Sequence, residues 1–179
     1  MRLSKKEFWE NVFRFQNKQG SCALKVNVKV KKILKQILGK SLIEYTRDYH
    51  DYVLWEILYK KHLTKSKGGK VLEIGSAPGD YLVRLSEVFG FVPYGVEYSK
   101  NGVEINKKIF AAHGLDPCNV IYADFFSKEF KDQYRSYFDI VVSRGFIEHF
   151  TDLNDVIQKH LDLLKEGGYL LVAFQIFEV

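Results

Sequence analysis

Residues 71–85 read VLEIGSAPGDYLVRL, in which an apolar run ends at a carboxylate and a tight glycine turn leads into an amphipathic pattern. Gly75, Ala77 and Gly79 stand at alternate positions after Glu73. Glycine has no side chain and tolerates unusual dihedrals, so such a turn lets the backbone approach a ligand closely. The turn opens a helix, whose first N–H groups favour a carboxylate or a phosphate. The stretch therefore predicts a strand, a binding loop and a helix.

From this unit to the end of the sequence, short apolar runs alternate with helical patterns. The predicted strands are KVLEI (70–74), FVPYGVE (91–97), NVIYAD (119–124), FDIVVS (138–143) and GGYLLVAFQI (167–176). The predicted helices include residues 79–89, 100–112 and 152–165. Strands of Val, Ile, Leu and Phe that alternate with helices are typical of a parallel sheet covered on both faces. The predicted fold is therefore α/β, a Rossmann-like doubly wound parallel sheet, with an N-terminal helical extension.

Residues 1–67 are expected to form this extension, a basic helical cap that precedes a 68–179 core. They hold 16 Lys and Arg against 6 Asp and Glu, whereas residues 68–179 hold 11 against 16. Such an asymmetry suits either solvated lysines on exposed helices or a basic face for an anionic partner. We expect the cap to cover the strand ends and to help enclose a substrate.

Within the extension, apolar residues at helical spacing predict helices over 33–45 and 44–63. The second helix carries a stripe that includes Tyr49, Val53 and Ile57, with Leu54 and Leu58 beside it. Residues 22–30, CALKVNVKV, alternate instead and favour a short strand.

The composition excludes several protein classes. The chain has 179 residues, 46% of them hydrophobic and 27% charged, which is ordinary for one globular domain. It has no apolar run long enough to cross a bilayer and no secretory signal at its start. Cys22 and Cys118 lie far apart, outside any metal-type spacing, and suit a reducing compartment. We expect a cytoplasmic protein without a metal site.

The ends of the predicted strands are the candidate ligand-binding positions. In open sheets of this kind, ligands bind outside the carboxyl ends of the strands, where the strand order reverses. Those ends carry Glu73, Glu97, Asp124 and Ser143. A P-loop is excluded because Gly79 is not followed by Lys and Ser or Thr. A G-x-G-x-x-G dinucleotide fingerprint fits weakly, since its middle and last positions are alanine and aspartate. An adenosine that carries an amino-acid tail in place of a phosphate is the third ligand considered.

Four segments, in order, resemble the class I S-adenosylmethionine-dependent methyltransferases over about residues 68–176. They are VLEIGSAPGD, YGVEYSKNGVEINKK, VIYADFF and FDIVVSRGFIEHFTDLNDVIQKHLDLLKEGGYLLV. The IEHF segment is most similar to that of methyltransferases acting on small molecules. The resemblance implies S-adenosylmethionine as cofactor and methyl transfer to an O, N or C nucleophile of a small molecule. Two alternatives are a nucleic-acid methyltransferase, which the basic extension would suit, and a non-catalytic binding domain on the same fold.

The resemblance also implies roles for residues at the methionine end of the cofactor. The backbone of Gly75, Ala77 and Gly79 would contact the methionine part, and Ser143 would border it. Ala77 stands where the family often has glycine. Glu73 would hold the loop or the cofactor's amino group, and its plainer alternative is to cap the turn.

The nucleoside and the acceptor are assigned to other residues by the same resemblance. Glu97 would accept both ribose hydroxyls, and Asp124 would meet the adenine amino group with Phe125 beside the ring. His149 would act as general base if the nucleophile is protonated, because histidine titrates near neutral pH. The plainer alternatives are a surface acid for Glu97, a capping acid for Asp124, a core aromatic for Phe125 and a packing role for His149.

The family pattern further leads us to expect two more strands after the fifth, whereas the sequence ends at Val179. Without them YLLVAFQI would form an exposed apolar edge. We expect either a longer natural protein or a partner chain that covers this edge.

Overall fold

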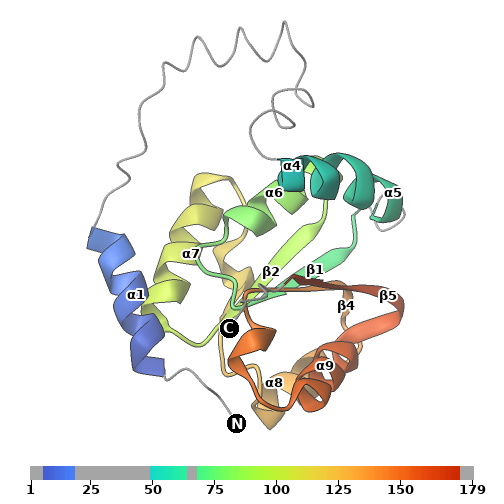
Figure 1. Ribbon diagram of the computed structural model, residues 1–179. Coiled ribbons are helices and arrows are strands. Elements are labelled where there is room, and N and C mark those ends of the chain that lie inside the picture. Colours follow the sequence, from blue (N-terminus) through green and yellow to red (C-terminus); the bar gives the residue numbers. More distant parts are fainter. Residues whose placement is uncertain (1–5, 19–48, 64–67, 174–179) are drawn as a thin grey trace, which may run out of the picture. The chain divides into compact units, whose positions relative to one another are not determined.

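The computed structural model describes residues 6–18, 49–63 and 68–173 (Figure 1). These residues belong to two compact units. One unit contains the N-terminal helix α1 (Lys6–Lys18) together with the sheet and its helices, and the other contains the helical segment 49–63. The predicted domain boundary at residue 67 stays a prediction. Helix α1 belongs to the same unit as the sheet, whereas residues 49–63 belong to the other unit.

Five parallel strands form one sheet in the order β3–β2–β1–β4–β5. They are β1 (Lys70–Ile74), β2 (Val92–Glu97), β3 (Val120–Tyr122), β4 (Phe138–Arg144) and β5 (Leu164–Ala173). β1 lies in the middle of the sheet, and β2 and β3 follow on one side of it. The chain then returns to place β4 and β5 on the other side of β1. This order confirms the predicted doubly wound sheet. It places the reversal of strand order, and hence the expected ligand site, above the carboxyl ends of β1 and β4.

Helices cover both faces of the sheet. Figure 1 shows α6 (Asp80–Phe89) and α7 (Lys100–Ala112) on one side, and α8 (Lys128–Tyr134) and α9 (Leu153–Asp162) on the other. Short 3-10 helices, η3 (Pro117–Asn119) and η4 (Ile147–His149), precede β3 and follow β4. Side chains of Ser99, Ser127 and Asp152 cap the starts of α7, α8 and α9, as serine and aspartate do in general.

The strands are strongly apolar because their side chains form the buried core of the protein. Leu72 and Ile74 of β1 pack in a buried cluster with Phe138 and Val141 of β4 and with Phe130 of α8. Residues 71–74 of β1 are all buried, because a central strand with helices on both faces has no side in contact with water. Glu73 lies in this run, and only 2% of its surface is exposed. The carboxylate at the end of β1 is therefore placed inside the protein.

The last strand lies at an edge of the sheet. Among the described residues, β5 pairs with β4 alone. The expectation of further strands, or of a partner chain, at this edge stays a prediction.

The segment 49–63 is helical as far as His62, as predicted, and Leu63 lies in a turn. It consists of α4 (Tyr49–Tyr52), the π-helix η1 (Val53–Tyr59) and α5 (Lys60–His62). The predicted apolar stripe was wrong in phase, because Ile57 and Leu58 are exposed whereas Trp55, Tyr59 and Leu63 are buried. Hydrogen bonds from i to i+5 widen the turn of a π-helix and align side chains differently from an α-helix. The predicted strand at 22–30 and helix at 33–45 lie outside the described residues.

None of the helices in the described part of the chain has the length and apolar character needed to cross a membrane.

Candidate functional site

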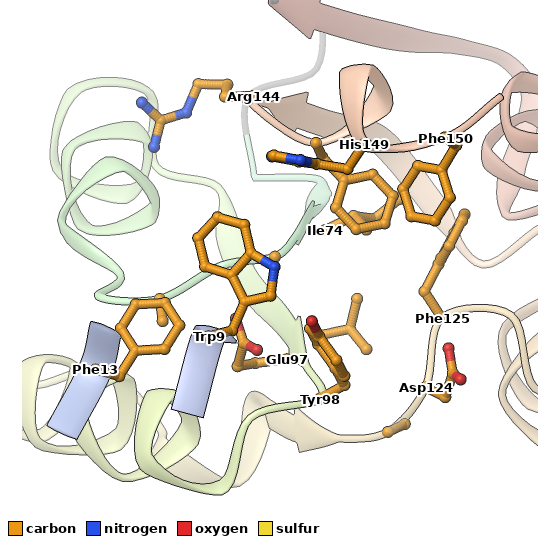
Figure 2. A pocket seen from close by; sticks show the side chains of 16 residues that line it. Trp9, Phe13, Ile74, Glu97, Tyr98, Asp124, Phe125, Arg144, His149 and Phe150 are labelled. Carbon is orange, nitrogen blue, oxygen red and sulfur yellow. The ribbon is translucent and has the colours of Figure 1, made fainter. Parts of the chain in front are cut away.

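A cavity of about 220 Å³ lies at the carboxyl ends of the strands (Figure 2). Six residues predicted for the site from sequence line it, namely Gly75, Ala77, Glu97, Asp124, Phe125 and His149. Three predicted residues, Glu73, Gly79 and Ser143, do not. The structure therefore brings together the residues predicted for the nucleoside and acceptor sides, and it places part of the predicted methionine end behind the cavity wall.

The glycine turn is held from behind by α7. Asn106 is fully buried, and its Nδ2 donates to Ser76 Oγ at 2.7 Å. Gly79 adopts a φ of +109°, and a Cβ added there would lie 2.3 Å from Asn106 Oδ1. Gly75, whose φ is +69°, faces the cavity instead and donates its N–H to Val96 O at 3.0 Å. Gly79 thus lets the loop pack closely on α7, while Gly75 and Ala77 line the cavity.

Glu97 is a buried carboxylate at the end of β2. It is 3% exposed, and its Oε1 accepts a hydrogen bond from the N–H of Ser99 at 2.8 Å. Burial raises the pKa of Glu97, and backbone N–H groups of Ser99, Ala77 and Tyr98 oppose that shift. A carboxylate has about four lone-pair positions, so it retains capacity for further donors. The arrangement suits a ligand that presents hydroxyl groups.

Asp124 and Phe125 follow β3 on the neighbouring side. Asp124 Oδ1 accepts from the N–H of Phe126 at 2.9 Å, so this side chain shapes the turn as well as lining the cavity. Phe125 is 7% exposed and lies edge-on to Phe146, with ring centroids 5.7 Å apart. It is therefore both a core aromatic and a wall of the cavity, and its binding role stays a prediction.

Glu73 is paired with an arginine from the end of β4. Arg144 donates to Glu73 Oε1 from Nε at 2.9 Å and from Nη2 at 2.7 Å, and its guanidinium stacks on the Tyr81 ring at 3.7 Å. Burial raises the pKa of Glu73 to about 7, even though Arg144 acts in the opposite direction. Glu73 Oε2 and the hydroxyl of Ser143 are buried without a hydrogen-bond partner among the described residues. The two side chains point to opposite faces of the sheet, because Glu73 pairs in register with Val142 and Ser143 with Ile74.

His149, the predicted general base, lines the cavity. It ends η4, which follows β4, and Trp9 of α1 lies edge-on to its ring with centroids 5.4 Å apart. Figure 2 shows Trp9 between His149 and Glu97. α1 therefore contributes to the cavity wall, while the predicted role of residues 1–67 as a cap stays a prediction.

Sequence reasoning missed several lining residues, among them Trp9, Phe13, Tyr98, Phe146 and Phe150. Phe146 and Phe150 flank the predicted histidine, so their aromatic character next to a strand end was an available signal. Trp9 and Phe13 precede the glycine turn by more than 60 residues, and no local pattern links them to it. Within the described residues, no group of three or more His, Cys, Asp or Glu side chains could hold a metal ion.

Comparison with known proteins identifies a family. The profile of the family described as a methyltransferase domain matches residues 65–174, which is more than half of the chain. A ubiquinone biosynthesis O-methyltransferase from Shewanella sp. (strain ANA-3) is 25% identical over 107 residues, covering 59% of this chain and 43% of that protein. The chain thus spans less than half the length of this curated relative.

Solved structures share the fold. A candidate S-adenosyl-L-methionine-dependent methyltransferase from Methanococcus maripaludis superposes with a TM-score of 0.56 at 20% identity, over 86% of this chain and 66% of that chain. The [4+2]-cyclase SpnF superposes with a TM-score of 0.55 at 20% identity, over 66% of this chain and 43% of that chain. At this identity the likeness shows the fold alone, and a fold of this kind carries more than one reaction.

Proposed function

We propose that this chain, which belongs to the class I S-adenosylmethionine-dependent methyltransferase family, transfers a methyl group to an O, N or C nucleophile of a small molecule. S-adenosylmethionine is the cofactor that this family implies. The acceptor, and the activity of the whole protein, belong to this proposal, since the chain spans only part of its relatives.

The placement of Glu97 gives the proposal its main support. This carboxylate is buried at the end of β2, beside the glycine turn and on the same cavity as Asp124 and Phe125. A charged acceptor in a buried site is stabilised when hydroxyl donors reach it, and such charge-assisted hydrogen bonds are stronger than neutral ones. The two hydroxyls of a ribose meet this need, with adenine reaching toward Asp124 and Phe125.

One buried polar atom beside the glycine turn also fits the cofactor. Glu73 Oε2 has no hydrogen-bond partner among the described residues, and buried polar groups are rarely left unpaired in proteins. An ammonium group at the methionine end would supply a donor for the carboxylate. Glu73 does not line the cavity, so it would bind this group only if the wall beside Arg144 opened, while Arg144 holds its other oxygen.

The protein's part in the reaction is to align the reactants and to receive a proton. When bound, S-adenosylmethionine supplies the activated methyl group. Gly75 and Ala77 would orient its methionine part through their backbone. His149 would take the proton of an acceptor hydroxyl or amine, since it lines the cavity directly after β4. Orientation of this kind removes at best roughly 7 to 11 kcal/mol of a barrier.

A small acceptor is favoured over a nucleic acid by the walls of the cavity. Trp9 and Phe13 from α1 face Phe146 and Phe150 from the segment after β4, so the space is enclosed by aromatic rings. Pockets for small molecules are concave and largely apolar with a few placed polar groups, as here. The Shewanella relative is an O-methyltransferase, which agrees with a hydroxyl acceptor.

The proposal is tested by calorimetric titration with S-adenosylhomocysteine, the demethylated product. Glu97→Ala removes the acceptor for both ribose hydroxyls, and a loss of about 2 to 4 kcal/mol corresponds to roughly 30- to 1,000-fold weaker binding. Glu104→Ala, on the exposed face of α7, is the matched control and should bind like the wild type. NAD and ATP should not compete.

Turnover on a panel of phenols, amines and carbon acids then separates methyl transfer from binding alone. A wild-type protein that binds neither S-adenosylmethionine nor its product would contradict the proposed function. Equal affinity of Glu97→Ala and the wild type would refute only the placement of the ribose.

A further inference from the structure

A carboxylate of α1 is bound to the first turn of α7. Glu10 Oε1 accepts from the backbone N–H of Lys100 at 2.8 Å, and Glu10 Oε2 accepts from the N–H of Asn101 at 3.4 Å and from its Nδ2 at 2.8 Å. The backbone carbonyl of Glu10 also accepts from Asn101 Nδ2 at 3.4 Å. One side chain thus ties a helix at the start of the chain to a helix that follows β2.

This contact completes the cap of α7. The first N–H groups of any helix lack partners within the helix. Here the N–H of Ser99 goes to Glu97, the N–H of Gly102 goes to Ser99 Oγ at 3.1 Å, and those of Lys100 and Asn101 go to Glu10. The same turn that holds the predicted ribose carboxylate therefore also holds α1.

Further contacts at two points of α1 fix its direction across the cavity. Near its start, Lys6 Nζ donates to the hydroxyl of Tyr122 at 3.1 Å and lies over the Tyr98 ring at 5.9 Å. Trp9, one residue before Glu10, lies against His149 and lines the cavity. Phe13, one turn later in α1, also lines the cavity. α1 therefore spans the opening from the end of β3 to the segment after β4.

The two carboxylates on this turn influence each other. The pKa of Glu97 is raised chiefly by burial, and the negative charge of Glu10 adds to that effect. Burial acts to raise the pKa of Glu10, but hydrogen bonds from the backbone N–H groups of Lys100 and Asn101 and from the side chains of Ser99 and Asn101 together outweigh it, so this pKa is lowered. Glu10 thus stays ionised and bound to α7 at neutral pH.

We infer that Glu10 is a positioning residue of this site, which holds α1 on α7 so that Trp9 and Phe13 close the cavity over the ligand bound at Glu97. The inference rests on the proposed function for the identity of that ligand. Exchange of the ligand then requires release of the Glu10 contact, and the enclosed acceptor space exists only while the contact is made. A cap with a merely structural role would stabilise the protein without affecting ligand exchange.

The first test needs no ligand. Hydrogen exchange of the α1 backbone amides is measured in the wild type, Glu10→Ala and Glu7→Ala, the last an exposed glutamate of the same helix. Glu10→Ala should exchange about 3- to 30-fold faster, as expected for loss of a helix cap, and Glu7→Ala should match the wild type. Glu10→Gln keeps an acceptor oxygen and should recover part of the protection. Unprotected α1 amides in the wild type, or equal exchange in wild type and Glu10→Ala, would overturn the inference.

The second test follows ligand exchange through Trp9. In Trp55→Phe only one tryptophan remains, and its fluorescence reports S-adenosylhomocysteine binding in a stopped-flow instrument. Adding Glu10→Ala should raise both the association and the dissociation rate constants, by about 3- to 30-fold, because α1 opens more often. Glu97→Ala should raise the dissociation rate constant alone. Unchanged rate constants in Glu10→Ala would overturn the inference even though the cofactor binds. If the wild type does not bind this probe, the proposed function fails and the exchange measurement still decides the role of Glu10.

Discussion

Replacing Glu73 by glutamine should remove a dependence of protein stability on pH. In the folded protein burial raises the pKa of Glu73 to about 7, and Arg144 offsets only part of that shift. In the unfolded chain the carboxyl has its ordinary value of 4.5. Between these two values the unfolded chain releases the proton while the folded protein keeps it, so the wild type loses stability as the pH rises from 4.5 to 7. One pKa unit is worth about 1.4 kcal/mol, which makes the full loss about 3 kcal/mol.

The measurement is the free energy of unfolding in urea for the wild type and Glu73→Gln at several pH values from 4.5 to 8.5. The free energy of unfolding of the wild type should fall by about 3 kcal/mol relative to that of the variant up to pH 7, and above pH 7 the two curves should be parallel. Glu104→Gln controls for the loss of a surface carboxylate. If the difference in free energy of unfolding between the two proteins does not change with pH, or if it shifts in favour of the wild type as the pH rises, the Arg144 pair outweighs burial. Either result would refute this reasoning. If Glu73 also binds the cofactor's ammonium group, S-adenosylmethionine should move the transition to lower pH.

Two further predictions concern the glycine turn and His149. Gly79→Ala should lower the free energy of unfolding in urea by about 2 to 4 kcal/mol, because it combines a strained φ with a clash against Asn106. Gly114 also has a positive φ but lies in open space, so Gly114→Ala should lower the free energy of unfolding by only about 1 to 2 kcal/mol, and equal losses would exclude the clash. His149→Ala should lower turnover of a hydroxyl acceptor about 100- to 10,000-fold with little effect on S-adenosylhomocysteine affinity in calorimetry, and unchanged turnover at saturating acceptor would remove this histidine from the mechanism.

Local pattern was enough to predict the sheet and one side of the site. The five apolar runs became five parallel strands, and because parallel strands end at one edge, Glu97, Asp124 and Gly75 could be placed together from sequence. Ser143, predicted by the same reasoning, is buried and does not line the cavity, so its role stays a prediction. A strand-end position does not decide which way a side chain points, since side chains alternate between the faces of a strand.

Gly79 shows a second limit of sequence reasoning. The backbone of this glycine is predicted to contact the ligand, and the structure adds a second reason for glycine here, because an added side chain would clash with Asn106. Both uses require the same residue type, so only the packing partner distinguishes them. α1 shows a third limit, because its place over the cavity depends on contacts between residues far apart in the chain. Such tertiary contacts leave no periodic signal in either segment.

The sequence distance between α1 and its anchor has a consequence for how the chain folds. Glu10 and Lys100 are 90 residues apart, so at ordinary synthesis rates the helix waits roughly 5 to 20 seconds before its partner is made. A 13-residue helix on its own is marginal in water. Long-range contacts of this kind form late, after the local βα units have closed their own short loops. We therefore expect α1 to dock on a core that has already folded and, among the helices and strands of the described unit that contains the sheet, to unfold locally at the lowest free energy.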